Sequence, residues 1–347
     1  MNHRTLLLTA LASLVGVSGS AQFVRIVVQG TGAPQVFSDL AAAVAAAQPD
    51  DHLYLSGGTF TVSGNIVVDK PLHFVGAGIH PDSSSVTTIT TINTSGATQV
   101  HTAGSGSSFT GIRFSNTMQY GDGTANFSPT GIVFQRCEFN SYAHLGAGSE
   151  TVIDECIFRF RFYGYDGTAL VTRSIFTYWG NATHAPISAF GTGGLTMDHC
   201  TVIGGRITNS ANSTVSNCIF TRNSSAPFWQ SSGSTITNNL CVFTSLTSNM
   251  TPGATNGNVL GLNAADSLFV NEISGNYEFS DDLHLVAVSP GVGMATDGTD
   301  VGVYGTTTPY KPGAVPFNPH LRSAVVDPTT NMNGELPVNI RVAAQTH

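Results

Sequence analysis

A six-residue motif that recurs along the middle of the chain limits the possible folds more than any other feature of the sequence. Each copy has an apolar residue, two variable residues, a mostly small residue, one variable residue and a bulky apolar residue. The middle positions of successive copies lie 18 to 26 residues apart. The seven copies are Phe109–Phe114, Phe134–Phe139, Ile153–Phe158, Val171–Phe176, Met197–Val202, Val215–Phe220 and Ile236–Cys241. Such a period indicates a repeat architecture.

The composition of the motif predicts β-strands. The copies are short, rich in β-branched and aromatic residues, and bounded by Gly, Asn, Ser and Thr. The offset of three between the first apolar residue and the middle residue breaks strict alternation and indicates a tight bend, after which the middle and last residues share a face. Each copy then forms one rung of a coil, with rungs stacked ~4.8 Å apart.

The middle row of the stacked rungs contains four of the five cysteines, namely Cys137, Cys156, Cys200 and Cys218. We interpret this row as an interior ladder of small side chains. Disulfides between neighbouring rungs are the alternative, because the rise lies within the bridging range of Cα separations. No Cys or His pair has the close spacing of a zinc site.

With these rungs, the sequence from residue 22 to residue 305 resembles the right-handed parallel β-helix, or pectin lyase-like, proteins. The segment 36–47, followed by 49–60, looks like the N-terminal cap helix and first coil of that family, and Ser38 is the predicted helix N-cap. The segments 283–294 and 297–304 are similar to its closing coil. The resemblance implies an all-β fold, a single-stranded right-handed parallel β-helix with an N-terminal cap helix and a C-terminal extension over 306–347.

The N-terminus predicts export. A short basic start, an uncharged stretch from Thr5 to Val17 and the small residues before Gln22 are typical of a signal peptide over residues 1–21. No later run is long enough for a membrane helix. The net charge of −8 gives no basic surface for nucleic acid. We therefore expect an extracellular, cell-surface or periplasmic protein.

Four side chains beside the middle row are candidates for catalysis. Asp154 and Asp198 occupy equivalent positions two rungs apart, ~10 Å, with Arg173 and His199 beside them. The alternative places Arg173 and His199 in an outward charge ladder with Arg136, Glu155, Asn217 and Asn238. The paired-aspartate and Gly-His-Gly signatures of the hydrolases in the resembling family are absent at the matching positions. No cofactor is expected, although the turn at 297–300 has the carboxylates of a weak calcium site.

Aromatic residues that follow the strands are candidates for carbohydrate binding. Exposed rings beside arginines stack on sugar faces while polar groups take hydroxyls. Packing of these rings on one another beneath long loops is the alternative interpretation. The candidate residues are Tyr163, Tyr165, Tyr178, Trp179, Trp229, Arg159 and Arg161.

A row of apolar side chains is predicted to face outward. Ile157, Ile175, Ile219 and Leu240 lie between the middle and last motif positions, and such a row is rarely left in water. A protein partner would cover it, or the segment 306–347 would. We expect the protein to bind a polysaccharide or cell-surface component through one lateral face. A polysaccharide lyase or glycoside hydrolase and a structural, adhesin-like module are the alternatives.

Overall fold

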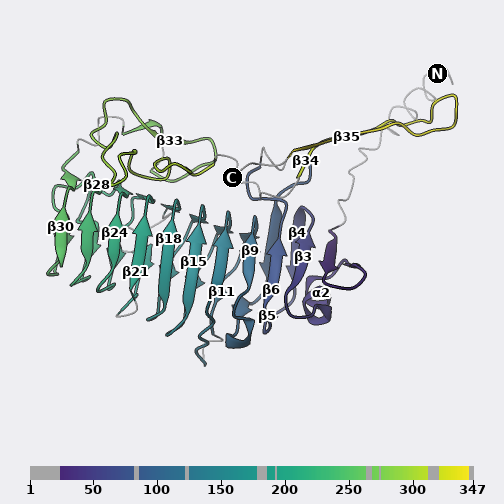
Figure 1. The fold of residues 1–347 in the computed structure, drawn as a ribbon, viewed down its shortest axis with the longest axis horizontal. Coiled ribbons are helices and arrows are strands. Elements are labelled where there is room, and N and C mark those ends of the chain that lie inside the picture. Colours follow the sequence, from purple (N-terminus) through teal and green to yellow (C-terminus); the bar gives the residue numbers. More distant parts are fainter. Residues whose placement is uncertain are drawn as a thin grey trace, which may run out of the picture.

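A computed structural model describes residues 24–81, 86–121, 125–177, 186–191, 194–262, 268–272, 275–311 and 320–343. The chain forms a right-handed parallel β-helix of about nine turns, drawn in Figure 1 as a row of stacked coils. The predicted fold class is confirmed. The predicted signal peptide lies outside the described residues.

Three long parallel sheets run along the helix, and each coil contributes one strand to each sheet. The parallel strands of sheet A are β3 (Asp51–Leu55), β6 (Leu72–Val75), β9 (Ser108–Thr110), β12 (Ile132–Gln135), β15 (Glu150–Asp154), β18 (Thr168–Thr172), β21 (Leu195–Asp198), β24 (Thr214–Ser216), β27 (Thr235–Thr237) and β30 (Ala254–Asn256). Those of sheet B are β4 (Gly58–Val62), β7 (Thr90–Thr94), β10 (Arg113–Phe114), β13 (Glu138–Phe139), β16 (Ile157–Phe158), β19 (Ile175–Thr177), β22 (Thr201–Ile203), β25 (Ile219–Phe220), β28 (Leu240–Cys241) and β31 (Val259–Leu260). Those of sheet C are β5 (Ile66–Val68), β8 (Thr98–Val100), β11 (Met118–Gln119), β14 (Ala143–His144), β17 (Phe162–Tyr163), β20 (Ile187–Ser188), β23 (Ile207–Thr208), β26 (Phe228–Trp229) and β29 (Thr247–Ser248).

The bend between sheets A and B consists of one residue in the left-handed region of backbone conformation. It precedes the middle residue of each motif, with φ of 51° at Arg136, 51° at Glu155, 45° at Arg173 and 47° at His199. Such a residue reverses the alternation of faces, because the strand after it no longer continues the pleat of the strand before it. The predicted bend is confirmed.

The middle residues form the predicted interior ladder. Cys137, Cys156, Cys200 and Cys218 are buried and unpaired, so the alternative of disulfides between rungs is wrong. The backbone N–H of Cys137 donates to Sγ of Cys156 (3.4 Å), and that of Cys156 donates to Oγ of Ser174 (3.1 Å). Each acceptor side chain also donates to a carbonyl, as Ser174 Oγ does to Thr172 (2.8 Å). The ladder therefore satisfies backbone groups that the bend removes from the sheets.

Two columns of phenylalanines fill the coil beside this ladder. One runs through Phe74, Phe109 and Phe134, with neighbouring ring centroids 4.8 and 4.9 Å apart and nearly parallel. The other runs through Phe114, Phe139, Phe158 and Phe176, at 5.3, 4.5 and 4.6 Å. Stacked pairs of this kind contribute roughly 0.5–1.5 kcal/mol each beyond their area burial.

The N-terminal end of the β-helix is closed. Strands β1 (Ile26–Gln29) and β2 (Gln35–Phe37) extend sheet A in the antiparallel direction, and helix α2 (Leu40–Ala46) packs beside them. The cap helix is confirmed, but its predicted N-cap at Ser38 is wrong. Asp39 is the N-cap, because its carboxylate accepts from the backbone N–H of Ala42 (2.7 Å).

A cover folds back over the outer face of sheet B after the last coil. It comprises the described residues 268–311, with the short antiparallel strands β32 (Phe269–Asn271) and β33 (Asp282–Leu285). Segments 283–294 and 297–304 belong to this cover and form no closing coil. The apolar side chains that the cover supplies are Phe269, Tyr277, Leu283, Ala295, Val301, Val303 and Tyr310.

The cover buries the outward apolar row. Ile157, Ile175, Ile219 and Leu240 are all fully buried against it, so they are not available to a protein partner. The prediction that a segment of the same chain covers the row is confirmed. The segment predicted for this role was wrong, because the cover is 268–311 and the extension from residue 306 supplies only its last part.

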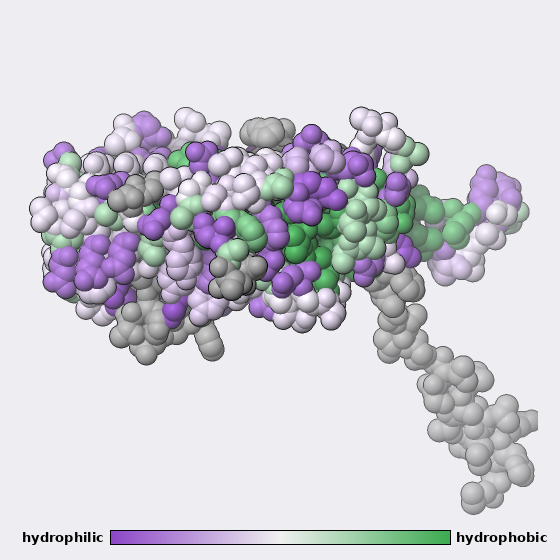
Figure 2. Space-filling model, turned by 90° about the horizontal axis from the view of Figure 1, so that it is seen from below, coloured by the Kyte–Doolittle hydropathy of each residue, from purple (hydrophilic) through white to green (hydrophobic). Residues whose placement is uncertain are grey.

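The described part of the extension after the cover is a β-hairpin. Strands β34 (His320–Val326) and β35 (Val338–Ala343) pair only with each other. Figure 1 shows the hairpin reaching past the end of the molecule that carries α2. In Figure 2 it carries apolar residues next to the body and polar residues at its tip.

Replacing a thiol of the interior ladder tests its hydrogen-bonding role. We expect Cys156→Val to lower the free energy of unfolding by roughly 1–3 kcal/mol, because the N–H of Cys137 would lose its buried acceptor. Cys156→Ser is the control, since Ser174 performs this role one rung further on, and it should stay closer to the wild type. Urea denaturation measures both. Equal losses for the two variants would contradict the acceptor role.

The anchoring of the cover on sheet B generates a second prediction. Glu138 is fully buried between Arg113 and Arg159, and Arg159 also donates to the carbonyl of Tyr277 in the cover (2.7 Å). Glu138→Ala should cost about 3–5 kcal/mol of unfolding free energy, because it leaves two arginines without their shared carboxylate. The exposed Glu150→Ala is the control. A cost at Glu138 no larger than at Glu150 would show that the triad is not what anchors the cover.

Candidate functional site

The outer face of sheet C carries one row of polar and aromatic side chains. Its strands place inward and outward residues alternately, so that Phe162 and Phe228 are buried while Tyr163 and Trp229 are only half-buried. Parallel pairing keeps the outward residues in register from coil to coil. The row reads Gln99, Gln119, His144, Tyr163, Ser188, Thr208, Trp229 and Ser248.

Four rings gather where this row passes β14 and β17. Tyr142 stacks on Tyr163 with centroids 6.1 Å apart and planes 16° apart, and His144 lies 5.3 Å from Tyr163. Tyr165, 47% exposed, meets His144 edge-on at 5.3 Å and Tyr163 at 5.4 Å. The two predicted tyrosines therefore lie together, partly packed on each other and partly open to solvent.

Arg161 fixes the position of the rings. Its guanidinium donates to Oη of Tyr163 (2.8 Å) and lies 6.0 Å from the ring of Tyr142 and 5.6 Å from that of Phe160. A planar cation on aromatic faces is a stabilising arrangement. Among the predicted carbohydrate-binding residues, Arg161 thus belongs to the same cluster as Tyr163 and Tyr165.

A pocket of about 390 Å³ opens beside the rings. His144 and Tyr165 form part of its wall, and Gln119, Tyr120, Ala125, Asn126 and Leu145 contribute the rest of the side-chain lining. The amide of Gln119 is held by the carbonyl of Gly121 (2.7 Å), and that of Asn126 by both backbone groups of Ala147. A concave wall with aromatic rings and a few fixed polar groups is typical of small-molecule and sugar sites.

His144 is the polar group of this pocket with unused hydrogen-bonding capacity. Its Nε2 is buried, and no described residue forms a hydrogen bond with it. Burial lowers the pKa of His144 to about 4, so the imidazole is neutral at physiological pH. A neutral imidazole nitrogen can donate to or accept from a ligand hydroxyl, depending on its tautomer.

A second aromatic position lies three coils further along the same row, ~14 Å away at the usual strand spacing. Trp229 is half-buried, and the guanidinium of Arg206 lies 5.1 Å from its ring. Nε of Arg206 has no hydrogen-bond partner among the described residues, and burial lowers the pKa of Arg206. Trp229 and Arg206 thus present a ring and a cation next to each other on sheet C.

Arg159 lies apart from this row. It contacts Glu138 and Tyr277 on the sheet B side and lies 5.3 Å from the ring of Phe279 in the cover. Its contacts are those of a residue that holds the cover. Tyr178 and Trp179, also predicted for carbohydrate binding, lie outside the described residues.

The catalytic candidates Asp154 and Arg173 form one ion pair. Asp154 is level with Thr172 and Asp198 in sheet A, as the spacing predicted. Its carboxylate accepts from Nη2 of Arg173 at 2.7 and 2.6 Å and from Oγ1 of Thr172 (2.7 Å). Arg173 also contacts Thr308, at the end of the cover. These partners already occupy both carboxylate oxygens.

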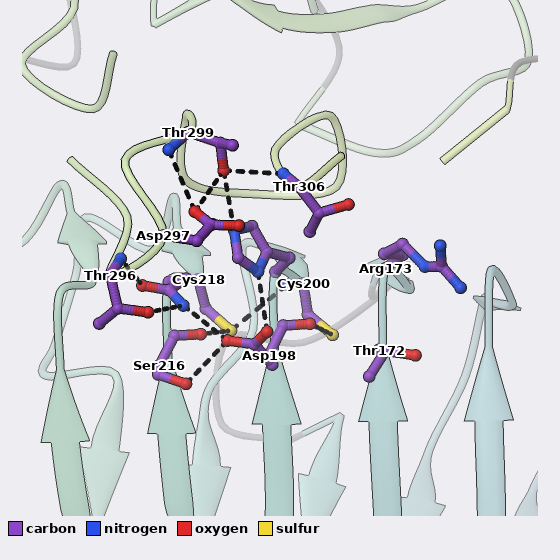
Figure 3. A network of polar contacts seen from close by, with 12 residues as sticks. Thr172, Arg173, Asp198, Cys200, Ser216, Cys218, Thr296, Asp297, Thr299 and Thr306 are labelled. Carbon is purple, nitrogen blue, oxygen red and sulfur yellow. Dashed lines mark hydrogen bonds and ion pairs between the residues drawn. The ribbon is translucent and has the colours of Figure 1, made fainter. Parts of the chain in front are cut away.

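Asp198 and His199 form a separate network beneath the cover (Figure 3). Oδ2 of Asp198 lies 2.8 Å from Nδ1 of His199, and Oδ1 accepts from Ser216 (2.8 Å) and Asn217 (2.7 Å). Burial alone would raise the pKa of Asp198, but the hydrogen bonds from His199, Ser216 and Asn217 lower it overall. Arg173 points away from this network in Figure 3. The structure therefore arranges the four candidates as two pairs.

The cover closes over His199. Its side chain is 3% exposed, with Oγ1 of Thr299 3.4 Å from Nε2 and Asp297 3.8 Å away. A Cβ atom on Gly305 would lie 2.5 Å from Cδ2 of His199, so the cover has no room for a substrate there. Proton transfer between His199 and a polysaccharide would require displacement of this loop.

The outward ladder that includes His199 is largely buried, contrary to the prediction of a surface charge ladder. Arg136 and Glu155 are 0% and 2% exposed and pair through two hydrogen bonds at 3.0 and 3.3 Å. Asn217 donates to Thr296 (3.0 Å) and Asn238 to the carbonyl of Met294 (2.9 Å), both in the cover. The ladder points away from the coil interior as expected, but its side chains bind the cover instead of facing solvent.

The turn proposed as a weak calcium site uses its carboxylates internally. Oδ1 of Asp297 accepts from the N–H (3.0 Å) and the hydroxyl (2.6 Å) of Thr299, and Asp300 accepts from the N–H of Gly293 (2.9 Å). Within the described part of the chain, no three His, Cys, Asp or Glu side chains come together in an arrangement that could hold a metal ion. None of the described helices has the length and hydropathy to cross a membrane.

Sequence reasoning missed His144, Gln119, Asn126 and Arg206. The signal that could have found His144 is its distance of seven residues from the middle residue Cys137, the same as that of Tyr163 from Cys156.

Comparison with known proteins assigns the chain to no family, because no family model matches the chain and no curated protein matches it.

The environment of His144 can be tested by titration. We expect its imidazole signals in an NMR titration to move near pH 4, because burial disfavours the charged ring. Folding stability linked to this group is fully present above its unfolded pKa of about 6.5 and is lost as the pH falls toward the folded value. A His144→Gln variant identifies the signals. Titration near the ordinary value would contradict a buried wall position.

Proposed function

We propose that the protein is an exported β-helix that binds polysaccharide through the outer row of sheet C. The observation that carries the proposal is the convergence of the pocket, the rings of Tyr163 and Tyr165, and the unpartnered Nε2 of His144 on one lateral face. Rings offer stacking faces for sugars, and Nε2 of His144 has hydrogen-bonding capacity that no described residue uses. The predicted signal peptide supports an extracellular setting for such a site.

The long axis of the β-helix suits a chain-like ligand. The first ring cluster and Trp229 lie on one row, three coils apart, so that an extended glycan along the axis would meet both. Arg206 beside Trp229 gives the second position a cation for a carboxylate or sulfate on the sugar. The row between them consists of Ser188 and Thr208, which are 7% and 4% exposed, so the glycan would contact mainly the two aromatic positions.

Retention of the protein by polysaccharides tests the proposal. The purified protein is tested on a panel of neutral and acidic polysaccharides by affinity electrophoresis, with calorimetry on any that retain it. Tyr163→Ala and Trp229→Ala should each weaken binding about tenfold or more, equivalent to ~1.4 kcal/mol, because each removes a stacking face. Tyr54→Ala is the matched control, since Tyr54 is an exposed ring on sheet A, and it should leave binding unchanged.

The same panel tests the alternative of a polysaccharide lyase or glycoside hydrolase. Unsaturated products or new reducing ends that disappear in Asp198→Asn would favour catalysis at the Asp198–His199 pair over simple binding. No retention and no cleavage on any polysaccharide would remove both carbohydrate functions. Retention unaffected by Tyr163→Ala and Trp229→Ala would place the site on another face.

A further inference from the structure

The two ends of the β-helix differ in whether they are capped. At the N-terminal end, β1, β2 and α2 close the stack. At the other end, the last coil contributes β29, β30 and β31, and each is the edge strand of its sheet, with no described strand paired beyond it. Backbone groups on an open edge are a template for pairing with another strand, and solenoids ordinarily need a cap there.

Among the described residues, this open edge lacks the usual protection against pairing. Natural sheets guard their edges with charged side chains, proline within the strand, or a covering element. Between Arg222 and Asp266 the chain contains no Asp, Glu, Lys, Arg or His, so the last two coils are uncharged. On the last coil, Thr255 and Asn256 are exposed, and Leu260 is 38% exposed.

The C-terminal hairpin has an apolar face that nothing in the described part of the chain covers. Its register places Leu321, Ala324 and Val326 opposite Val342, Ile340 and Val338, so these six side chains share one face. The four from Val326 to Val342 are each more than half exposed, at 56, 53, 56 and 57% in chain order. A two-stranded hairpin with an open apolar face is only marginally stable by itself.

We propose that the hairpin of one molecule adds to the open edge of the last coil of a second molecule. The hairpin and the edge lie at opposite ends of the molecule (Figure 1), so pairing between copies joins them head to tail. Strand addition would satisfy the free backbone groups of β30 and lay the apolar face of the hairpin over the uncharged coil. Because the two surfaces differ, the contact is heterologous and propagates into a linear assembly.

Sedimentation velocity of the whole protein over a range of concentrations tests the proposal. The wild type should show species heavier than the monomer that increase with concentration. Ile340→Lys with Val342→Lys should abolish them by charging the hairpin face, and Thr255→Lys with Asn256→Lys should abolish them by charging the edge. All four side chains are exposed, so the fold should survive, which circular dichroism verifies. Leu170→Lys, an exposed position in mid-helix, is the control that should retain assembly.

Mixing the two defective variants separates this arrangement from others. Each variant keeps one intact surface, so an equimolar mixture should form one-to-one dimers and nothing longer. A mixture that stays monomeric would overturn the proposal. Dimers of the edge variant alone, which still has an intact hairpin, would indicate hairpin-to-hairpin pairing and overturn it as well. A wild type that is monomeric at every concentration, as expected if the hairpin caps its own coil, would overturn it too. Tyr163→Ala should assemble normally, which keeps this result separate from glycan binding.

Discussion

The rest of the fold depends on the left-handed residue that turns the chain from sheet A into sheet B. This bend takes the next backbone N–H out of the parallel ladder, and a buried N–H without an acceptor is costly. The thiol, hydroxyl or amide of the next coil supplies the acceptor, ending in Asn239, whose N–H donates to Asn258 (2.9 Å). A small polar or thiol side chain therefore occupies the middle positions from Cys137 to Asn239, whereas the first copy has the buried Ile112. This explains why four cysteines occupy a row without forming disulfides.

The same bend also places the side chains that bind the cover. A left-handed residue directs its side chain away from the coil, so Arg136, Glu155, Arg173, His199, Asn217 and Asn238 stand in a line beside sheet B. The cover completes their hydrogen bonds, since the N–H of Lys311 donates to Glu155 (3.3 Å) and that of Thr296 to Asn217 (2.9 Å). The left-handed conformation strains the backbone of most residues. Asparagine, which occupies two of the six positions, is among the residues that adopt this conformation most readily.

The repeat could be read from sequence because each coil is a local pattern of about twenty residues. The equivalence of Asp154, Thr172 and Asp198 followed from spacing alone and agrees with the strand register. The cover could not be read, because it has no repeat and its contacts join residues far apart, such as Asn217 and Thr296 or Arg159 and Tyr277. For the same reason the polar ladder was expected in solvent, whereas it lies under the cover.

In the candidate site, too, some features could be predicted from sequence and others depend on contacts between distant residues. The aromatic side chains were evident from composition, but their grouping depends on sheet C, whose strands of two or three residues carry too weak a pattern to fix their register. Strand pairing places Tyr163 beside His144, whereas Arg159, four residues before Tyr163, lies on the far side of a turn against the cover. The cover occupies the outer face of sheet B and buries His199, whereas the outer face of sheet C has an open pocket and accessible rings. If molecules join head to tail, that face continues from one molecule to the next, and an extended polysaccharide would meet the aromatic row of each molecule in turn.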